Sequence, residues 1–313
     1  MKALVTGGAG FIGSHLVDKL LQRGYQVRII DNLSSGKIEN ISHVLNKVEF
    51  MKGDLKIKDD ALKAVVNVDV IFHFAANPEV RVSTTDPEIH FNENVVATFN
   101  LLEAMRKKDV KRLVFASSST VYGEPEEIPV DENAPIKPVS VYGASKAACE
   151  NLIHAYTKLY GIKAIILRYA NVVGPRLRHG IVHDMIIKIK QNNEELEVLG
   201  DGTQIRSYVY IDDAIEAILT AHEKTITDFE VYNVANEDWI TVDEVVKTIL
   251  NTLGTERRII HKPVLHGVGW PGDVKKIALK IDKLKNLGWK PKMNSKEAIK
   301  NTTKALIKEL GLP

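Results

Sequence analysis

Two side chains with complementary chemistry, Tyr142 and Lys146, lie four residues apart in the segment Val141-Tyr142-Gly143-Ala144-Ser145-Lys146. If a helix runs through this segment, both side chains lie on one face of it. A Lys ammonium near a phenol stabilises the phenolate and lowers a pKa that is about 10 in a free Tyr, which would make the Tyr a usable acid or base near neutral pH. The pair alone also fits a helix surface with one aromatic and one charge, so its meaning depends on the elements that position it.

Three glycines, Gly7, Gly10 and Gly13, follow an apolar segment of strand length and precede apolar residues at helical spacing. Glycine permits a tight turn, a close approach of the backbone to a pyrophosphate and close packing of helix on strand. The helix start adds unpaired N–H groups and a positive dipole end, which favour phosphate. The sequence therefore predicts a dinucleotide site. A P-loop is excluded because Ser14-His15 follows Gly13, where a P-loop needs a Lys.

Asp31 ends the second apolar segment, 18 residues after Gly13. An acid there can accept hydrogen bonds from both ribose hydroxyls of an adenosine and repels a 2′-phosphate, so NAD is favoured over NADP. Asp54, in Gly53-Asp54-Leu55, could lie near the adenine amino group, and the small residues of Phe74-Ala75-Ala76 could let the cofactor backbone pass. A loop acid and small-residue packing explain these two segments equally well.

A run of hydroxyl residues, Ser117-Ser118-Ser119-Thr120-Val121-Tyr122-Gly123, follows the fifth predicted strand directly. Ligands of a parallel sheet bind beyond the carboxyl ends of its strands, so these hydroxyls should face the same crevice as the glycine turn. With Tyr142 and Lys146 they provide a hydroxyl, a phenol and an ammonium around one substrate oxygen. A hydrolase with a Ser nucleophile is disfavoured, because no Gly-x-Ser-x-Gly occurs and no His or acid pattern of a hydrolase accompanies the serines.

The elements that position these residues alternate between strand and helix six times over about 170 residues, which predicts an α/β fold with a doubly wound parallel sheet. Most of the strands are apolar on both faces, as in a buried parallel sheet. The predicted strands are Lys2–Thr6, Tyr25–Ile30, Val48–Met51, Val70–Phe74, Arg112–Ala116 and Ala164–Leu167. The predicted helices include Ser14–Arg23, Asp59–Val66, Pro87–Lys107 and Tyr142–Tyr160.

After Asn171 this pattern changes, and Gly174-Pro175-Arg176 indicates an exit from the sheet. Asp212–His222 and Val231–Val234 predict one more helix and one more strand that return to it. We expect a cofactor-binding domain of residues 1–172 plus about 207–235, and a smaller mixed α/β lobe of about 173–206 and 236–313. The lobe would hold a helix at Val182–Gln191 and the segments Thr241–Leu253, Arg258–His261, Asp282–Leu287 and Ser295–Leu310.

Composition limits the class of protein. Hydrophobic residues make up 44% and charged residues 26% of the 313 residues, and the net charge is +2, which is typical of a soluble globular protein without a nucleic-acid or membrane partner. The single cysteine, Cys149, excludes an intramolecular disulfide and a Cys-based zinc site. No segment is long and apolar enough for a signal peptide or a membrane span, so we expect a cytoplasmic protein.

Together these motifs resemble an extended short-chain dehydrogenase/reductase and, within that superfamily, the UDP-glucose 4-epimerases and related nucleotide-sugar epimerases. The resemblance covers nearly the whole chain and rests on residues 6–13, 31–36, 117–123, 142–146 and 168–171. It implies a Rossmann-type sheet with a smaller C-terminal substrate lobe, NAD as the cofactor and a UDP-sugar as the substrate. It also implies a homodimer formed through the helices Pro87–Lys107 and Tyr142–Tyr160.

The resemblance also implies roles for single residues. Ser118 would be the catalytic hydroxyl, Tyr142 the acid and base, and Lys146 would hold the nicotinamide ribose and tune the Tyr. The implied cofactor site comprises Gly7, Gly10, Phe11, Ile12, Gly13, Asp31, Asn32, Ser34, Ser35, Gly36, Asp54, Leu55, Phe74, Ala75, Ala76, Asn94, Ser117, Tyr142, Lys146 and Tyr169. The implied substrate site comprises Ser118, Thr120, Tyr142, Asn171, Val198, Arg206 and Asp273, with Asn171 and Arg206 on the diphosphate. No metal is implied, and we assign His179 and His183 to a pocket wall or to the surface.

Relatives that share the oxidation step differ beside the catalytic hydroxyl. Nucleotide-sugar 4,6-dehydratases carry an Asp-Glu pair after it and sugar-nucleotide decarboxylases carry a Glu, whereas this chain has Ser119-Thr120. It therefore lacks the catalysts for elimination. The chain departs from the epimerases at Trp270, which replaces the Arg that usually precedes Pro-Gly-Asp and contacts the diphosphate. Losing that charged contact should weaken substrate binding, and the residues that could compensate are Lys275, Lys276, Arg176, Arg178 and His179.

The resulting expectation is an isomerase that interconverts UDP-glucose and UDP-galactose through a transient 4-keto intermediate. Three alternatives stay open. One is an epimerase of UDP-N-acetylhexosamines or UDP-uronates, a second is an NAD-dependent sugar reductase or dehydrogenase, and the third is a cofactor-binding scaffold without activity.

Overall fold

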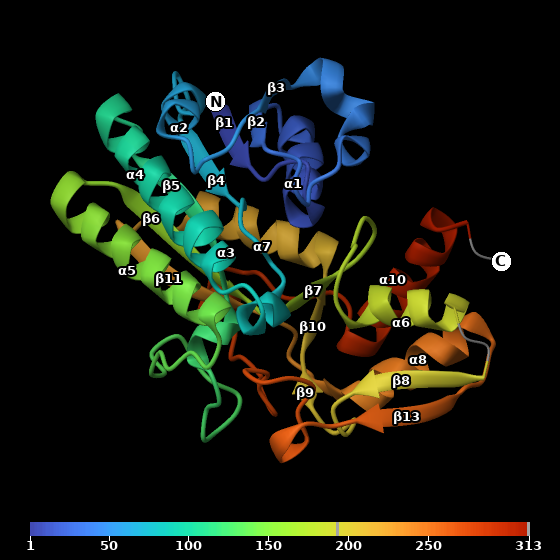
Figure 1. Ribbon diagram of the computed structural model, residues 1–313. Coiled ribbons are helices and arrows are strands. Elements are labelled where there is room, and N and C mark those ends of the chain that lie inside the picture. The colour runs from blue at the N-terminus through green and yellow to red at the C-terminus, as the bar shows by residue number, and fades with distance from the viewer. Residues whose placement is uncertain (192–193, 312–313) are drawn as a thin grey trace.

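The computed structural model describes residues 1–191 and 194–311, whose central element is a seven-stranded parallel sheet in the order β11-β6-β5-β4-β1-β2-β3 (Figure 1). From β1 the strand order runs outward in both directions, which confirms the predicted doubly wound α/β class. The strands are β1 (Lys2–Thr6), β2 (Gln26–Asp31), β3 (Glu49–Lys52), β4 (Val70–His73), β5 (Arg112–Ser118), β6 (Lys163–Tyr169) and β11 (Phe229–Val234).

Helices cover both faces of this sheet. Successive residues of a strand point to opposite faces, and in β1 Val5 packs with the helices of one face while Leu4 packs with those of the other. Double-sided burial explains why the strands are apolar throughout. On the face of Val5 lie α1 (Phe11–Gln22) and α7 (Ile211–Lys224), and on the face of Leu4 lie α2 (Lys58–Ala64), α4 (Ala97–Lys108) and α5 (Val141–Tyr160).

The strands β5 and β6 each run two residues further than the sequence predicts, to Ser118 and Tyr169. The prediction stopped at polar residues, but the structure buries Arg168 inside β6 because its guanidinium is paired with Glu150 of α5. Ser118 and Tyr169 are in register at the ends of the two strands. The extension therefore brings a hydroxyl and a phenol together at the carboxyl edge of the sheet.

The helix predicted over Pro87–Lys107 is interrupted. The structure has a short helix α3 (Glu88–His90), a π-helical segment Phe91–Val96 and then α4. The buried Asn94 lies in the π-helical segment, where its side chain accepts from the Asn77 N–H (3.0 Å) and donates to the Ser145 hydroxyl (2.9 Å). π-helical turns often occur at functional sites, and this one ties the start of α4 to α5.

A second core lies beside the carboxyl edge of the sheet. It contains α6 (Ile181–Gln191), α8 (Val242–Leu253) and α10 (Ser295–Glu309), which lie near β8 and β13 in Figure 1. The strands of this region form three pairs: β7 (Asn171–Val173) with β10 (Tyr208–Tyr210), β8 (Glu195–Leu199) with β13 (Arg258–Lys262), and β9 (Ile205–Arg206) with β12 (Ile240–Thr241). The sequence analysis did not predict β8.

The chain crosses between the two cores more than once. After β10, α7 and β11 return to the main sheet, as predicted, and β11 pairs with β6. Later, Val274, Trp289 and α9 (Asp282–Asn286) join the core on the face of α1 and α7. The division into two domains at the predicted boundaries stays a prediction. Within the described residues, no helix combines the length and the apolar character that a membrane span requires.

Candidate active site

The glycine turn lies between β1 and α1, against the end of β4. Gly7 has a φ of +67°, and a Cβ there would lie 2.8 Å from the Ala75 backbone nitrogen. A Cβ at Gly13 would lie 2.2 Å from the Gly7 carbonyl oxygen, so a side chain at either position would push these elements apart. The N-cap of α1 is Gly10, which makes no side-chain capping hydrogen bond. The resulting backbone cradle at a helix start fits a diphosphate.

Asp31, at the end of β2, is held in place beside this cradle. Its carboxylate accepts from the Ala9 N–H (2.9 Å) and from the Leu33 N–H (2.8 Å). Burial raises the pKa of Asp31 and these two backbone donors act in the opposite direction. A Cβ at Gly36 would lie 2.8 Å from both carboxylate oxygens. Glycine at position 36 therefore leaves the space beside the Asp31 carboxylate free, which fits the predicted contact of this carboxylate with ribose hydroxyls.

Tyr142 stands in the first turn of α5. Ser140 caps this helix by accepting from the Gly143 N–H (3.1 Å), and a Cβ at Gly143 would lie 2.6 Å from the Thr120 carbonyl oxygen. The glycine therefore lets the helix start pack directly against the segment that follows β5. That packing places the Tyr142 phenol near the Ser118 hydroxyl, which acts to lower the pKa of the phenol.

Lys146 lies one turn further along α5 and is 3% exposed. Its ammonium donates to the Ala116 carbonyl oxygen (2.8 Å) and lies 5.9 Å from the centroid of the Tyr142 ring. Burial lowers the pKa of Lys146 to about 8. Burial also raises the pKa of Tyr142 to about 12, although the hydrogen bond from Ser118 lowers it. The sequence predicts instead that Lys146 lowers the pKa of Tyr142. In the protein alone the ammonium faces a carbonyl oxygen and the ring rather than the phenol oxygen, so desolvation dominates.

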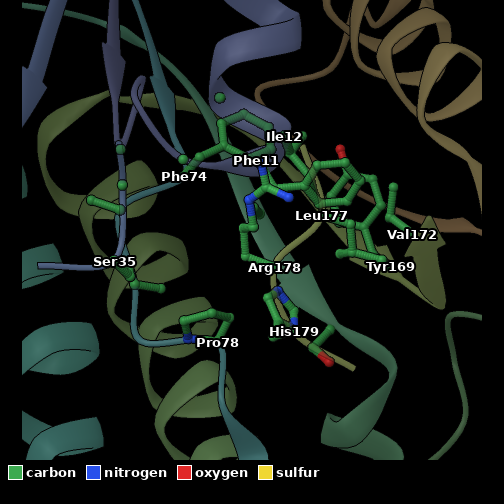
Figure 2. A pocket seen from close by; sticks show the side chains of 18 of the residues that line it. Phe11, Ile12, Ser35, Phe74, Pro78, Tyr169, Val172, Leu177, Arg178 and His179 are labelled. Carbon is green, nitrogen blue, oxygen red and sulfur yellow. The ribbon is translucent and has the colours of Figure 1, made fainter. Parts of the chain in front are cut away.

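These groups share one cavity of about 370 Å³ (Figure 2). Every residue of the predicted cofactor site except Asn94 lines it, as do Ser118, Thr120 and Asn171 of the predicted substrate site. Asn94 lies behind the wall, bonded to Ser145. The sequence analysis missed Lys37, Asn40 and Glu93, which also line the cavity. Lys56 pairs with Glu93 and with Asp54, but nothing in the spacing of these residues marks them.

A second cavity of about 270 Å³ adjoins the first, and Thr120, Asn171 and His179 line both. The remaining predicted substrate residues, Val198, Arg206 and Asp273, line this second cavity. The predicted substrate residues therefore extend from Tyr142 in the first cavity across the shared wall into the second.

Arg206 is already engaged in the second cavity. Its guanidinium pairs with the buried Asp273 carboxylate (2.7 Å) and donates to the Val274 carbonyl oxygen (2.5 Å). The sequence analysis expects Arg206 to pair with a substrate diphosphate, and the structure shows that Asp273 already compensates part of its charge. Trp270 lines the same cavity, and its buried indole N–H has no hydrogen-bond partner among the described residues.

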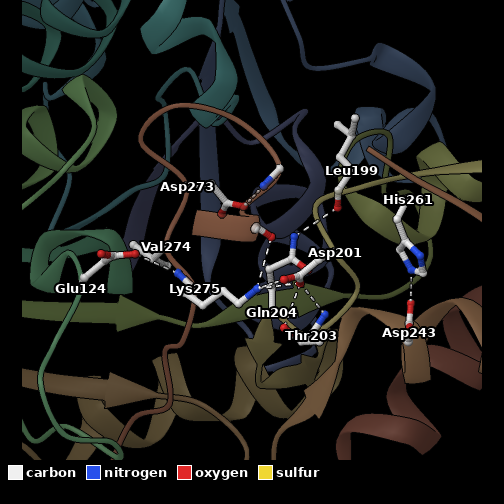
Figure 3. Close-up of polar contacts among 12 residues, drawn as sticks. Glu124, Leu199, Asp201, Thr203, Gln204, Asp243, His261, Asp273, Val274 and Lys275 are labelled. Atoms are coloured by element: carbon white, nitrogen blue, oxygen red, sulfur yellow. Dashed lines mark hydrogen bonds and ion pairs between the residues drawn. The ribbon is translucent and has the colours of Figure 1, made fainter. Parts of the chain in front are cut away.

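Three of the residues proposed to compensate for Trp270 have other partners. Figure 3 shows Lys275 turned to Asp201, with Nζ 2.5 Å from the carboxylate, and its backbone N–H donates to Glu124 (3.1 Å). Arg176 pairs with Asp18 and Arg178 with Glu309. Among the compensating candidates, Arg176, Arg178 and His179 line the first cavity, and His179 also lines the second.

The wall of the second cavity carries a further ion-pair network that was not predicted from the sequence. Arg81 donates to both oxygens of Glu79 (2.9 and 3.0 Å) and to Asp184 (3.2 Å), and all three residues line the second cavity. Nearby, burial lowers the pKa of His179. Within residues 1–191 and 194–311, no group of three or more His, Cys, Asp or Glu side chains could hold a metal ion.

A doubly wound parallel sheet with a glycine turn, an acid at the end of β2 and a Tyr-Lys pair beside a Ser defines the class of the short-chain dehydrogenase/reductases. The sequence model of the NAD dependent epimerase/dehydratase family matches residues 3–235, and the chain belongs to this family.

Several relatives match over nearly the whole chain. A putative UDP-glucose 4-epimerase of Methanocaldococcus jannaschii is 42% identical over 304 residues, which are 95% of each chain. A crystal structure of a UDP-galactose 4-epimerase is 48% identical, with a TM-score of 0.89, and covers 99% of this chain and 100% of its own. The structure of a Thermus thermophilus UDP-glucose 4-epimerase in complex with NAD is 38% identical, with a TM-score of 0.88 and a coverage of 97% and 98%.

Proposed function

We propose that this protein is an NAD-dependent UDP-sugar 4-epimerase that interconverts UDP-glucose and UDP-galactose. The observation that carries the proposal is the position of Ser118, Tyr142 and Lys146 in one cavity with the glycine turn and Asp31, next to a second cavity that shares part of its lining. The first cavity would hold NAD on the glycine turn and Asp31. The second would hold the substrate nucleotide, so that the sugar lies at Tyr142 between them. Relatives with epimerase names at 42% and 48% identity support this assignment.

Tyr142 would take the proton from the sugar 4-hydroxyl and return it, while Ser118 holds the same oxygen by a hydrogen bond. When bound, NAD supplies reversible hydride transfer at C4 and a positive ring beside the phenol. Such a charge is needed because burial raises the pKa of Tyr142 to about 12 in the protein alone. Lys146, with a pKa lowered to about 8, adds a second cation whose remaining N–H groups can hold ribose hydroxyls.

Dehydration is disfavoured because the acids that line the two cavities are already engaged. Among the described residues, Glu79 and Asp184 pair with Arg81, and Asp273 pairs with Arg206. In the first cavity, Asp54 and Glu93 pair with Lys56, and Asp31 accepts two backbone N–H groups. Glu124, which directly follows Gly123 of the hydroxyl run, accepts from the Lys275 N–H. In the part of the chain that the structure describes, no free carboxylate stands beside Ser118 to carry a proton beyond C4.

The wall of the second cavity also favours a neutral sugar. Glu79 and Asp184 face it with one guanidinium, that of Arg81, between them. The Glu79, Arg81 and Asp184 side chains together have a net negative charge, and burial lowers the pKa of the nearby His179. A uronate carboxylate would meet like charge there. The N-acetylhexosamines stay an alternative, since no charge distinguishes them from UDP-glucose.

One incubation tests the function. The purified protein, without added cofactor, is mixed with UDP-galactose, UDP-N-acetylgalactosamine and UDP-glucuronate separately, and the products are identified by chromatography and NMR. We expect UDP-glucose from the first and slower or no conversion of UDP-glucuronate. If none of the three is converted even with added NAD, the epimerase assignment is wrong. A product that accumulates together with free NADH would instead indicate the dehydrogenase alternative.

We further propose a cytoplasmic homodimer, because NAD and nucleotide sugars are intracellular metabolites and because apolar side chains are exposed on two neighbouring helical segments. Phe91 and Phe99 lie on the π-helical segment and α4, and Leu159 and Tyr160 lie at the end of α5. α4 packs beside α5, so these side chains can contribute to one interface. Sedimentation velocity should give twice the monomer mass of 34.9 kDa. A monomer at micromolar concentration would refute the interface.

A further inference from the structure

The loop between β7 and α6 lines the cofactor cavity together with the glycine turn. Arg176 and Arg178 of this loop line the same cavity as Gly10 and Phe11. Figure 2 shows the Arg178 guanidinium reaching into the cavity toward Phe11 and Phe74. The glycine turn supplies backbone N–H groups from one side only, so a diphosphate in the cradle would keep oxygens on its other side.

The loop is fixed in place by two helices. The Pro175 carbonyl oxygen bonds with His15 Nε2 (3.0 Å), and the Arg176 guanidinium donates to Asp18 (2.8 Å), both on α1. On α10, Glu309 accepts from the Arg176 backbone N–H (2.9 Å) and pairs with Arg178 (3.3 Å). These contacts hold Arg176 at a φ of +65°, a conformation that a non-glycine residue adopts at a cost of about 1 kcal/mol.

Both arginines line the cavity, and each guanidinium also has a buried nitrogen whose hydrogen-bonding capacity is unused among the described residues. Nη1 of Arg176 and Nη1 of Arg178 are buried and have no hydrogen-bond partner among the described residues, although Nη1 of Arg178 lies within ion-pair distance of Glu309. A buried cationic donor without a hydrogen bond is unfavourable unless a ligand completes it. A guanidinium matches the geometry of phosphate oxygens and binds them with two parallel hydrogen bonds.

We infer that Arg178, supported by Arg176, binds the cofactor diphosphate together with the glycine turn. This inference rests on the proposed binding of NAD. The nucleotide diphosphate would lie between backbone N–H groups of the turn and a guanidinium of the loop. Glu309 orients that guanidinium, so the C-terminal helix α10 contributes to cofactor retention. Arg178 is thereby a positioning residue for the cofactor and takes no part in proton transfer.

The test uses the NAD-loaded protein. Wild type, Arg178→Ala and Arg178→Lys are loaded with NAD and desalted, and the release of NAD is followed over time. We expect release about 10- to 100-fold faster in Arg178→Ala, because a charge-assisted contact is lost, and an intermediate rate in Arg178→Lys, which keeps the charge without the fork. The control is Arg23→Ala, which removes an arginine that pairs with Glu223 outside the cavity and should release NAD at the wild-type rate.

Competitors locate the contact. In competition with bound NAD, ADP-ribose should bind Arg178→Ala more weakly than wild type, by the same factor as NAD. Adenosine, which has no phosphate, should bind the two proteins equally. UDP affinity should not change. If Arg178→Ala holds NAD as wild type does, or if it loses UDP affinity instead, the inference is wrong while the proposed function stands. A wild-type protein that binds no NAD would refute both.

Discussion

Two buried cations lie beside helix α5 and differ in how their charge is satisfied. Arg168 of β6 donates to both oxygens of Glu150 (2.6 to 3.2 Å), to the Tyr122 hydroxyl (2.9 Å) and to the Glu132 carbonyl oxygen (3.0 Å). The pKa of Arg168 is raised, because its partners outweigh its desolvation. Lys146 on α5 makes one hydrogen bond, to Ala116, and burial lowers its pKa to about 8.

The comparison indicates which buried charge is structural and which is functional. A fully hydrogen-bonded network holds a fold in one arrangement, whereas a buried cation with spare donors at a cavity is poised for a ligand. Each network also holds a tyrosine, Tyr122 beside Arg168 and Tyr142 beside Lys146, and burial raises the pKa of both to about 12. Four variants test whether the two regions divide stability and catalysis in this way.

The largest effect is expected from Tyr142→Phe. The variant removes the proposed acid and base, and such groups contribute about 10²- to 10⁴-fold to rates. We expect kcat for epimerisation of UDP-galactose to fall by that factor, with little change in the melting temperature. Tyr122→Phe is the matched control, which should lose stability because Arg168 and Asn233 lose a partner, yet keep its kcat. A Tyr142→Phe protein that epimerises at the full rate would contradict the assignment.

The second effect is expected from Arg168→Leu. The substitution leaves the Glu150 carboxylate buried without its guanidinium, which should cost about 3 to 5 kcal/mol in the free energy of unfolding. Urea denaturation of the purified protein measures the loss. The double variant Arg168→Leu/Glu150→Leu should recover part of it, because no unpaired charge remains. If Arg168→Leu unfolds at the wild-type urea midpoint, the Arg168–Glu150 pair does not stabilise the folded protein.

Lys146→Met should have a smaller effect of opposite sign on stability. A pKa of about 8 in the folded protein, against 10.5 in the unfolded chain, corresponds to a cost of about 3 kcal/mol for the buried ammonium. The Ala116 carbonyl loses its donor at about 1 kcal/mol, so we expect a net gain of about 1 to 2 kcal/mol in the cofactor-free protein, together with reduced epimerase activity.

The pH dependence of the stability difference between Lys146→Met and wild type tests whether the buried ammonium causes it. Below pH 8 the lysine is charged in both states and the cost is fully present. Between about pH 8 and 10.5 the folded state binds fewer protons than the unfolded state, so wild-type stability rises relative to the variant. Above about pH 10.5 the difference changes sign, because only the lost hydrogen bond of about 1 kcal/mol remains. Denaturation midpoints of both proteins at several pH values measure this. A variant that is less stable than wild type at pH 7 would show that Lys146 is structural.

Ser118→Ala should have the smallest effect of the four. It removes one hydroxyl that bonds Tyr142, and a hydrogen bond of about 0.5 to 1.5 kcal/mol corresponds to about a 2- to 10-fold loss in kcat. The pH profile should shift with it, because the Ser118 hydroxyl lowers the pKa of Tyr142 and its loss moves the acidic limb, where the phenol is protonated, to higher pH. An unchanged profile would mean that Ser118 does not contact the phenol during turnover.

Local patterns predicted most of what lies on the main sheet. Gly7, Gly10 and Asp31 line one cavity because spacing along β1, α1 and β2 fixes their positions. Contacts between distant residues could not be predicted in this way. Arg178 pairs with Glu309, which lies 131 residues later in the sequence, and no periodicity links the two residues. The direction of the Tyr142 pKa failed for a related reason, because desolvation depends on the surrounding fold rather than on a neighbour four residues away.

The central claim is that the site oxidises C4 and returns the same hydrogen to its other face. The direct measurement is to let the enzyme equilibrate UDP-galactose in D₂O and to examine the sugar by NMR. We expect UDP-glucose and UDP-galactose with no deuterium at C4 and no other product, because the hydrogen never exchanges with solvent. Deuterium at C4, or a 4-keto-6-deoxy sugar formed by elimination, would contradict the account.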